Sequence, residues 1–361
     1  MILSRTWWTR VANAVRFLED AYEALRIGKS VVLNFNCDIP WFDTMIDELE
    51  QECSRISDVK RFAQLDCTSY YAEASKENKK DVETPGEILL KNFCSEEERK
   101  RYWPKTYRRS REYFLSQSQT STIRNSFVCV SGIEGSVAGD WMDSGSNYLK
   151  NFREDSEEEH GVFILVTKNA SKKAATGFSF LDYSDYVTDY DCMMLCLTLL
   201  SPLPCNRLKK MYMAEIVSNI TENNVEPAGE LIQQTFGLAE DPKRVIKEYF
   251  YENGITVPDL DAKIENAVWE AQIRIVFPQI ETFRRSWIGK YEQRLKTHLP
   301  ITGADGTRLN KVSDLEITHL CRFSNAGMPG RGTLMKMRDA RNTLAHIGTL
   351  SYTELLELKI F

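Results

Sequence analysis

The apolar positions in the first half of the chain alternate between helical spacing and short continuous runs. A helical pattern covers roughly residues 8–27 and ends at Gly28, and the apolar run SVVLNF follows at 30–35. Further strand-like runs are KRFAQLDC at 60–67, SFVCVSG at 126–132 and GVFILVTK at 161–168. Continuous apolar strands between helices are typical of a mostly parallel sheet that is covered on both faces. We therefore expect an α/β domain in this half.

Two helices in this half carry start signals. Thr84, Pro85 and Glu87 fit the N-cap, first and third positions of a helix, which is a capping box with proline in its favoured place. Ser95 and Glu98 form a second capping box. The charged sequence that follows it predicts one long helix, which extends to about residue 118.

The second half reads as helical, and we find no convincing strand from about residue 187 onward. Its longest helix covers 279–298, and the last two are predicted at 335–348 and 351–361. We place a domain boundary near 250–260. The expected fold is an α/β domain at 1–250, with a helical lid-like region, followed by an all-α bundle at 251–361.

Composition indicates a cytoplasmic protein without a membrane span. The chain has 361 residues, of which 42% are hydrophobic, and no uninterrupted apolar window approaches the length of a membrane helix. The N-terminus lacks the apolar segment of a secretory signal. The nine cysteines are scattered, mostly within apolar runs, and none forms a CxxC pair. Buried free thiols in a reducing compartment explain this distribution.

The net charge of −6 conceals an asymmetry. Residues 271–361 carry 14 Lys and Arg against 8 Asp and Glu, so the acidic balance belongs to the rest of the chain. A basic C-terminal segment on an acidic body fits a polyanionic partner such as RNA. The alternative is ordinary surface charge.

Two glycine-containing segments resemble phosphate-binding loops but lack the required context. Gly28-Lys29-Ser30 matches the end of a Walker A loop, but it precedes the strand at 30–35 instead of following it, and position 23 is Glu. The segment 132–139 has the spacing GxxGxxxG, so we interpret it as a turn that needs positive φ. We expect no bound cofactor.

The order of elements over residues 20–240 nevertheless resembles the P-loop ATPases of the AAA and STAND types. The strand at 126–132 ends in Ser131-Gly132, where such enzymes carry the acidic pair that holds Mg²⁺. The resemblance therefore implies a degenerate, P-loop-NTPase-like domain, and ATPase activity is not expected. An active ATPase with an unusual phosphate loop is the opposing hypothesis.

A basic and aromatic segment lies at residues 99–111. Arg101, Arg108 and Arg109 alternate there with tyrosines and a tryptophan, which is the pattern of single-strand nucleic-acid binding. The alternative is a solvated helix whose aromatic side chains pack inward, and the preceding SEEE favours this alternative.

The segment Met335–Gly348 concentrates candidate chemistry on one helix. Met337, Ala340, Leu344 and Ile347 share the predicted core face. The opposite side carries Arg338, Arg341, Asn342, Ala345 and His346, and Lys336 adds a further cation. Cleavage of RNA needs a group that transfers a proton near neutral pH and a permanent cation for the phosphate. Histidine and arginine meet these needs without a metal.

The sequence Arg341-Asn342-Thr343-Leu344-Ala345-His346 matches the RNxxxH motif and resembles HEPN domains over residues 260–361. The resemblance implies a helical bundle in which two motifs form one site, in a homodimer or with a HEPN-containing partner. It implies that Arg341 contacts the phosphate, His346 transfers protons and Asn342 orients the site. Lys336 and Arg338, with Arg101, Arg108 and Arg109, are the expected RNA-binding residues.

The expected function is therefore a metal-independent HEPN endoribonuclease, a toxin or antiviral-defence effector that an N-terminal sensor or docking domain restrains. Many HEPN domains are not catalytic. The alternative is therefore an RNA-binding or scaffold subunit of a defence complex.

Overall fold

The computed structural model describes residues 2–71, 83–102, 109–152, 160–172, 175–303, 306, 308–324, 328 and 330–361. The chain divides into unit 1, Met1–Asp191, and unit 2, Cys192–Phe361. The boundary expected near 250–260 thus lies inside unit 2. Within the described residues, no helix combines the length and the apolar character that crossing a bilayer requires.

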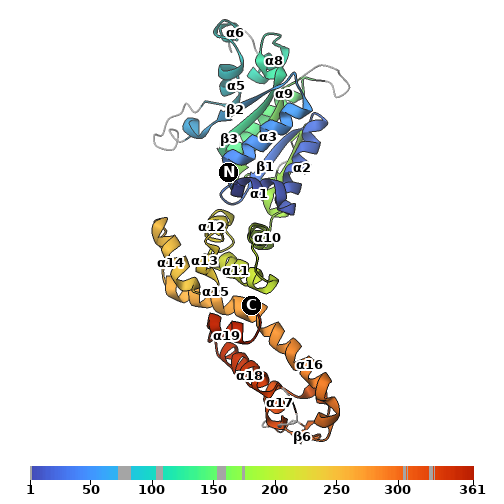
Figure 1. Ribbon diagram of the computed structural model, residues 1–361. Helices are drawn as coiled ribbons and strands as arrows, with labels where there is room; N and C mark the ends of the chain where they lie inside the picture. The colour runs from blue at the N-terminus through green and yellow to red at the C-terminus, as the bar shows by residue number, and fades with distance from the viewer. Residues whose placement is uncertain are drawn as a thin grey trace. The chain divides into compact units, whose positions relative to one another are not determined.

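A parallel sheet forms the centre of unit 1 (Figure 1). Its strands are β1 (Ser30–Phe35), β2 (Arg61–Asp66), β3 (Ser126–Glu134), β4 (Val162–Lys168) and β5 (Phe178–Asp182). They lie in the order β2-β3-β4-β1-β5, and every neighbouring pair is parallel. The four predicted strands and their parallel arrangement are confirmed. The edge strand β5 was not predicted.

The helices of unit 1 cover both faces of this sheet. They are α1 (Ile2–Arg10), α2 (Ala12–Arg26), α3 (Phe42–Ile56), α5 (Pro85–Phe93), α6 (Glu96–Arg101), α8 (Arg111–Gln117) and α9 (Gly135–Leu149), with short 3-10 turns at Thr122–Asn125 and Tyr183–Asp185. Val130 and Leu165 belong to the same buried cluster as Trp141 of α9. On the other face Phe35 packs against Phe17 of α2, with ring centroids 5.5 Å apart. Side chains that alternate between two covered faces explain the continuous apolar strands.

The capping box at Thr84 and Glu87 is confirmed, whereas Ser95 is an N-cap without the reciprocal Glu98 bond, and the long charged helix is wrong. The N–H of Thr84 donates to Glu87 at 2.7 Å, and the N–H of Glu87 donates to the Thr84 hydroxyl at 3.4 Å. Helix α6 ends at Arg101, and α8 begins anew after Ser110, whose hydroxyl accepts from the Tyr113 N–H at 3.2 Å. The predicted helix to residue 118 is therefore wrong. A proline at 104 in the sequence opposes its continuation.

Unit 2 is predominantly helical. Its helices are α10 (Asp189–Leu200), which begins just before the division, α11 (Arg207–Ile220), α12 (Val225–Leu231), α13 (Thr235–Leu238), α14 (Pro242–Glu252), α15 (Leu260–Ile275), α16 (Phe277–Lys296), α17 (Ile317–Phe323), α18 (Arg331–Ala345) and α19 (Tyr352–Glu357), with a 3-10 turn at Val312–Asp314. Strands β6 (Ile301–Thr302) and β7 (Arg308–Leu309) form a small antiparallel pair, which corrects the expectation of no strand here. The chain is an α/β region followed by a helical region.

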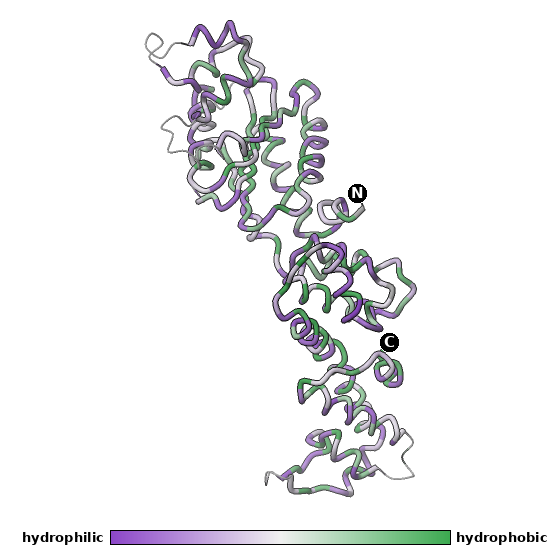
Figure 2. Tube along the Cα trace, turned by 90° about the vertical axis from the view of Figure 1, so that its left-hand side faces the viewer, coloured by the Kyte–Doolittle hydropathy of each residue, from purple (hydrophilic) through white to green (hydrophobic). Residues whose placement is uncertain are grey.

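Helix α15 connects the earlier and later helices of unit 2. It packs along α11, and the buried amide of Gln272 donates to the Tyr212 hydroxyl of α11 at 3.3 Å. Helices α14, α16 and α18 also contact α15. In Figure 2 hydrophobic and hydrophilic stretches alternate along the helices of this unit, as amphipathic helices require. Residues 192–250 are therefore part of the same packed unit as the predicted bundle.

Candidate functional site

Helix α18 carries the RNxxxH motif, and its burial follows the predicted pattern. Leu334, Met337, Ala340 and Leu344 are buried at helical spacing. This row packs against α15, α16 and α17. Packing of this apolar stripe stabilises the helix and fixes which side faces solvent.

The C-terminal end of α18 places His346 in the cap position. The N–H of Gly348 donates to the Thr343 carbonyl at 2.9 Å, and the N–H of Ile347 donates to the Leu344 carbonyl at 3.3 Å, which is the Schellman pattern. Ile347 occupies the left-handed position, at φ 62°, and is 73% exposed. Its predicted place in the core face is therefore wrong, because the helix ends before it.

Helix α15 holds the turn that follows the motif at both of its ends. The indole N–H of Trp269 donates to the Leu344 carbonyl at 2.9 Å. One turn further along α15, the Gln272 amide accepts from the Leu350 N–H at 2.7 Å and donates to the Leu350 carbonyl at 2.8 Å. No sequence motif indicated Trp269 or Gln272, because both act through contacts with backbone groups that are distant in the sequence.

The three candidate catalytic residues are accessible. His346 is exposed, whereas Asn342 and Arg341 are half-buried. Among the described residues, no hydrogen bond is made by the imidazole of His346 or by the side-chain amide of Asn342. Both groups are therefore open to an external ligand. The helix face that carries them is not sealed inside the chain.

Each cation of this helix that was predicted to meet RNA lies beside a carboxylate. Arg341 is 3.9 Å from Glu316, which precedes α17. Arg338 donates to Asp339 at 2.6 and 2.9 Å, and this contact raises the pKa of the Arg338 guanidinium. Lys336 donates to Glu357 of α19 at 2.7 Å. In the free chain these cations therefore have acidic neighbours, and an RNA phosphate must compete with them.

The other predicted RNA-binding residues belong to unit 1. Arg101 is exposed at the end of α6. Arg109 is also exposed, and its guanidinium lies over the Tyr113 ring at 4.2 Å from the centroid. Arg108 lies outside the described residues. Tyr113 belongs to α8 and lies just beyond the basic segment, so this contact does not decide between RNA binding and a solvated surface.

A polar cleft of about 460 Å³ lies at the carboxyl ends of β1 to β4. Its charged residues are Asp38, Asp43, Asp66, Glu134 and Lys168. Lys168 donates to Asp38 at 2.7 Å, and this hydrogen bond lowers the pKa of the Asp38 carboxyl. The loop after β1 contributes Asp38 where a phosphate-binding loop would contribute glycine amides and a lysine. This predominantly acidic lining does not fit a nucleoside triphosphate, because the carboxylates repel the phosphates.

Positive φ is confirmed for glycines of both motifs, but the segment 132–139 is not a turn, because β3 extends to Glu134 and α9 begins at Gly135. Gly28 has φ 74° and lies in the turn between α2 and β1. Gly28 and Lys29 therefore precede β1, which begins at Ser30. Gly132 has φ 70°, and a Cβ at this position would lie 2.4 Å from the Thr68 hydroxyl. Both glycines therefore serve backbone geometry.

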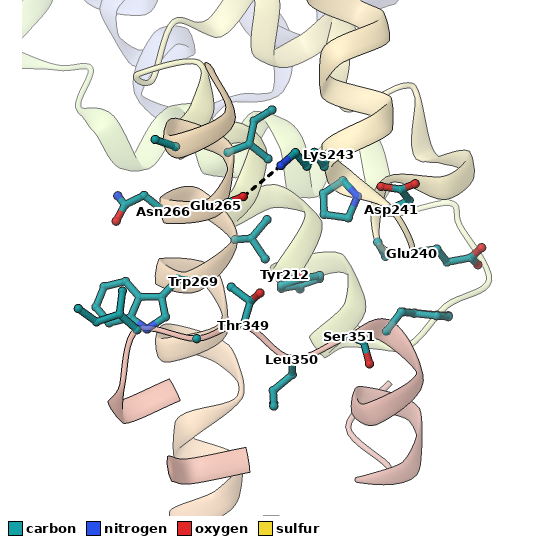
Figure 3. Close-up of a pocket in the computed structure, with 18 residues that line it drawn as sticks. Tyr212, Glu240, Asp241, Lys243, Glu265, Asn266, Trp269, Thr349, Leu350 and Ser351 are labelled. Atoms are coloured by element: carbon teal, nitrogen blue, oxygen red, sulfur yellow. Dashed lines mark hydrogen bonds and ion pairs between the residues drawn. The ribbon is translucent and has the colours of Figure 1, made fainter. Parts of the chain in front are cut away.

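A second cavity, which no sequence motif indicated, borders the end of α18. Its walls come from α11, α14, α15 and the segment 347–352, and Figure 3 shows the residues that line it. Trp269 and Leu350 are among them, so the residues that hold the turn after His346 also line this cavity.

Within the described residues, no group of three His, Cys, Asp or Glu is arranged to hold a metal ion. Comparisons with protein-family models, with curated proteins and with solved structures find no match to this chain.

Proposed function

We propose that unit 2 contains a HEPN-like endoribonuclease site formed by Arg341, Asn342 and His346 of α18. The observation that carries the proposal is the open imidazole of His346 at the end of the helix that also presents Arg341 and Asn342. The order of helices supports it, because the long α16, the short α17, the motif helix α18 and the short α19 follow the expected arrangement.

In the proposed reaction the 2′-oxygen of a ribose attacks the adjacent phosphorus, and the bond from phosphorus to the 5′-oxygen breaks. One imidazole takes the proton of the 2′-hydroxyl, and a second imidazole gives a proton to the leaving 5′-oxygen. Arg341 stabilises the negative charge that grows on the phosphate, and Asn342 orients the bound RNA. The products are a 2′,3′-cyclic phosphate and a 5′-hydroxyl.

This division of roles needs two copies of the motif. Each chain supplies one His346, whereas the reaction uses a base and an acid. Residues five apart on a helix are separated by about 140° and about 7.5 Å along the axis, so Arg341 and His346 of one chain leave α18 in different directions. A homodimer, or a partner with the same motif, supplies the second set.

Unit 1 is proposed as a degenerate P-loop-like domain that senses a signal or docks a partner and restrains the nuclease, as in a toxin or antiviral-defence protein. The connections that leave β1 and β4 run in opposite directions along the sheet, and α/β sheets bind ligands at such points. The cleft lies there, with a lining that disfavours phosphates.

The second candidate function is a non-catalytic RNA-binding or scaffold subunit. The pairing of Lys336, Arg338 and Arg341 with carboxylates favours the scaffold role within this candidate, because paired cations bind RNA weakly until the acids are displaced.

A cleavage assay on the wild-type chain and on His346→Ala separates the two functions. Cleavage that is lost in the variant supports the nuclease. Intact RNA with both proteins, also when partner proteins are present, supports the binding role.

A further inference from the structure

The cavity beside the end of α18 has the size and the lining of a binding site. Its volume is about 650 Å³, which lies within the usual range for ligand pockets. Tyr212, Ile264, Val268 and Leu350 are buried residues of its floor. The half-buried ring of Trp269 stands at its side (Figure 3). An apolar side chain that enters this cavity would be largely removed from water.

The rim of the cavity is acidic. Glu240, Asp241 and Glu265 line it, and Lys243 is the single cation among its described lining residues. Lys243 is already paired with Glu265 at 3.0 Å (Figure 3), and it also lies 2.8 Å from Asp261. The carboxylate of Glu240 makes no hydrogen bond or ion pair with the described residues. Asp241 is also paired, at 3.7 Å from Arg244, so Glu240 is the carboxylate of the described lining that is open to a cation.

Ile347 is an exposed large apolar residue of the cavity lining. It is 73% exposed and has φ 62°, a conformation that β-branched residues rarely adopt. A large apolar side chain that is held exposed in a strained backbone is expected where a partner covers it.

We propose that this cavity docks a basic peptide segment of a partner protein. An apolar side chain of the peptide packs on Tyr212, Val268 and Ile347. An adjacent arginine or lysine contacts Glu240 and competes with Lys243 for Glu265. The acidic rim is complementary to the cation, and the Trp269 ring adds a face on which a guanidinium can stack.

A peptide docked in this cavity affects the turn that follows His346. Trp269 and Leu350 line the cavity, and both also take part in the hydrogen bonds that hold this turn. This consequence, control of the ribonuclease site by a peptide, rests on the proposed function. The docking itself does not.

Fluorine NMR of the full chain labelled with 5-fluorotryptophan tests the docking directly. The Trp269 resonance is assigned with Trp269→Phe. The probes are N-acetyl-leucyl-arginine amide, N-acetyl-leucyl-glutamate amide, N-acetyl-seryl-arginine amide, spermine and a single-stranded RNA. The variant is Glu240→Gln with Glu265→Gln. The control is Glu248→Gln, which alters an exposed carboxylate of α14 that does not line the cavity and pairs with Arg244.

The leucyl-arginine peptide is expected to shift the Trp269 resonance. The double variant should weaken this binding about three- to tenfold, since each exposed charge pair is worth a fraction of a kcal/mol, and Glu248→Gln should leave it unchanged. The seryl peptide should bind more weakly, and the glutamate peptide should not bind. The proposal is overturned if the leucyl-arginine peptide causes no shift, or if the glutamate peptide causes an equal shift. It is also overturned if the resonance shifts only with spermine or only with the RNA. None of these resonance shifts depends on RNA cleavage.

Discussion

The side-chain amide of Gln272 forms two hydrogen bonds with the backbone of Leu350. It accepts from the Leu350 N–H at 2.7 Å and donates to the Leu350 carbonyl at 2.8 Å. Gln272 is fully buried, so neither backbone group can turn to water instead. Together with the Trp269 bond to Leu344, this contact fixes the turn that carries His346. The position of the candidate catalytic histidine therefore depends on α15 as well as on its own helix.

Replacing Gln272 with Met should destabilise unit 2 by roughly 2–3 kcal/mol, because the buried N–H and carbonyl of Leu350 lose their partners. Thermal unfolding followed by calorimetry measures the effect. Gln279→Met is the matched control, since the half-buried side chain of Gln279 makes no hydrogen bond with the described residues. Equal unfolding temperatures for the two variants would show that the Gln272 contact contributes little.

Replacing Glu316 with Gln should strengthen RNA binding, because the carboxylate that competes for Arg341 is removed. An exposed ion pair contributes about 0.2–1 kcal/mol, so a gain of up to about fivefold in affinity is expected. Fluorescence anisotropy with a labelled single-stranded RNA, at fixed salt, measures it. Glu292→Gln is the control, since Glu292 pairs with Lys296 on α16. An unchanged or weaker affinity in Glu316→Gln contradicts the competition.

Replacing Ile347 with Gly should raise the free energy of unfolding by about 0.5–1 kcal/mol, because glycine adopts positive φ without strain. Thr349→Gly is the control, since Thr349 does not have a positive φ. The control should lower the free energy of unfolding, because glycine adds freedom to the unfolded chain. A loss of stability in both variants, measured by denaturant unfolding, argues against strain at Ile347.

Much of the architecture followed from the sequence. The runs at 30–35, 60–67, 126–132 and 161–168 correspond to strands β1 to β4. Of these, β1, β3 and β4 are largely buried, because a sheet covered on both faces needs continuous apolar residues, whereas the edge strand β2 is exposed or half-buried. The edge strand β5 escaped notice, since its five residues are only half-buried and its pattern is mixed.

The candidate site was foreseeable only in part. The motif residues and the buried row of α18 followed from helical spacing. The helix ends at Ala345, however, and its left-handed turn moves Ile347 out of the core face. The roles of Trp269, Gln272 and Glu316 depend on packing between helices that are distant in sequence, which spacing along one helix does not encode.

The full chain should not bind ATP tightly in the presence of Mg²⁺. The loop after β1 lacks the glycines and lysine that hold phosphates, and Asp38 occupies it, paired with Lys168. Isothermal titration with ATP and Mg²⁺ should therefore give no measurable heat. Tight, Mg²⁺-dependent binding would contradict this prediction and revive the hypothesis of an ATPase with an unusual phosphate loop.

Cleavage of a labelled single-stranded RNA by the purified full chain, in the presence of a chelator, tests the central claim most directly. Wild type should give 2′,3′-cyclic phosphate and 5′-hydroxyl ends. His346→Ala should lower the rate about 10²–10⁴-fold, because a proton-transfer group is removed. Its unfolding temperature should stay near wild type, since the residue is exposed. His298→Ala, which also replaces an exposed histidine, should cleave normally. Equal cleavage by wild type and His346→Ala, with the same product ends, would contradict the ribonuclease assignment.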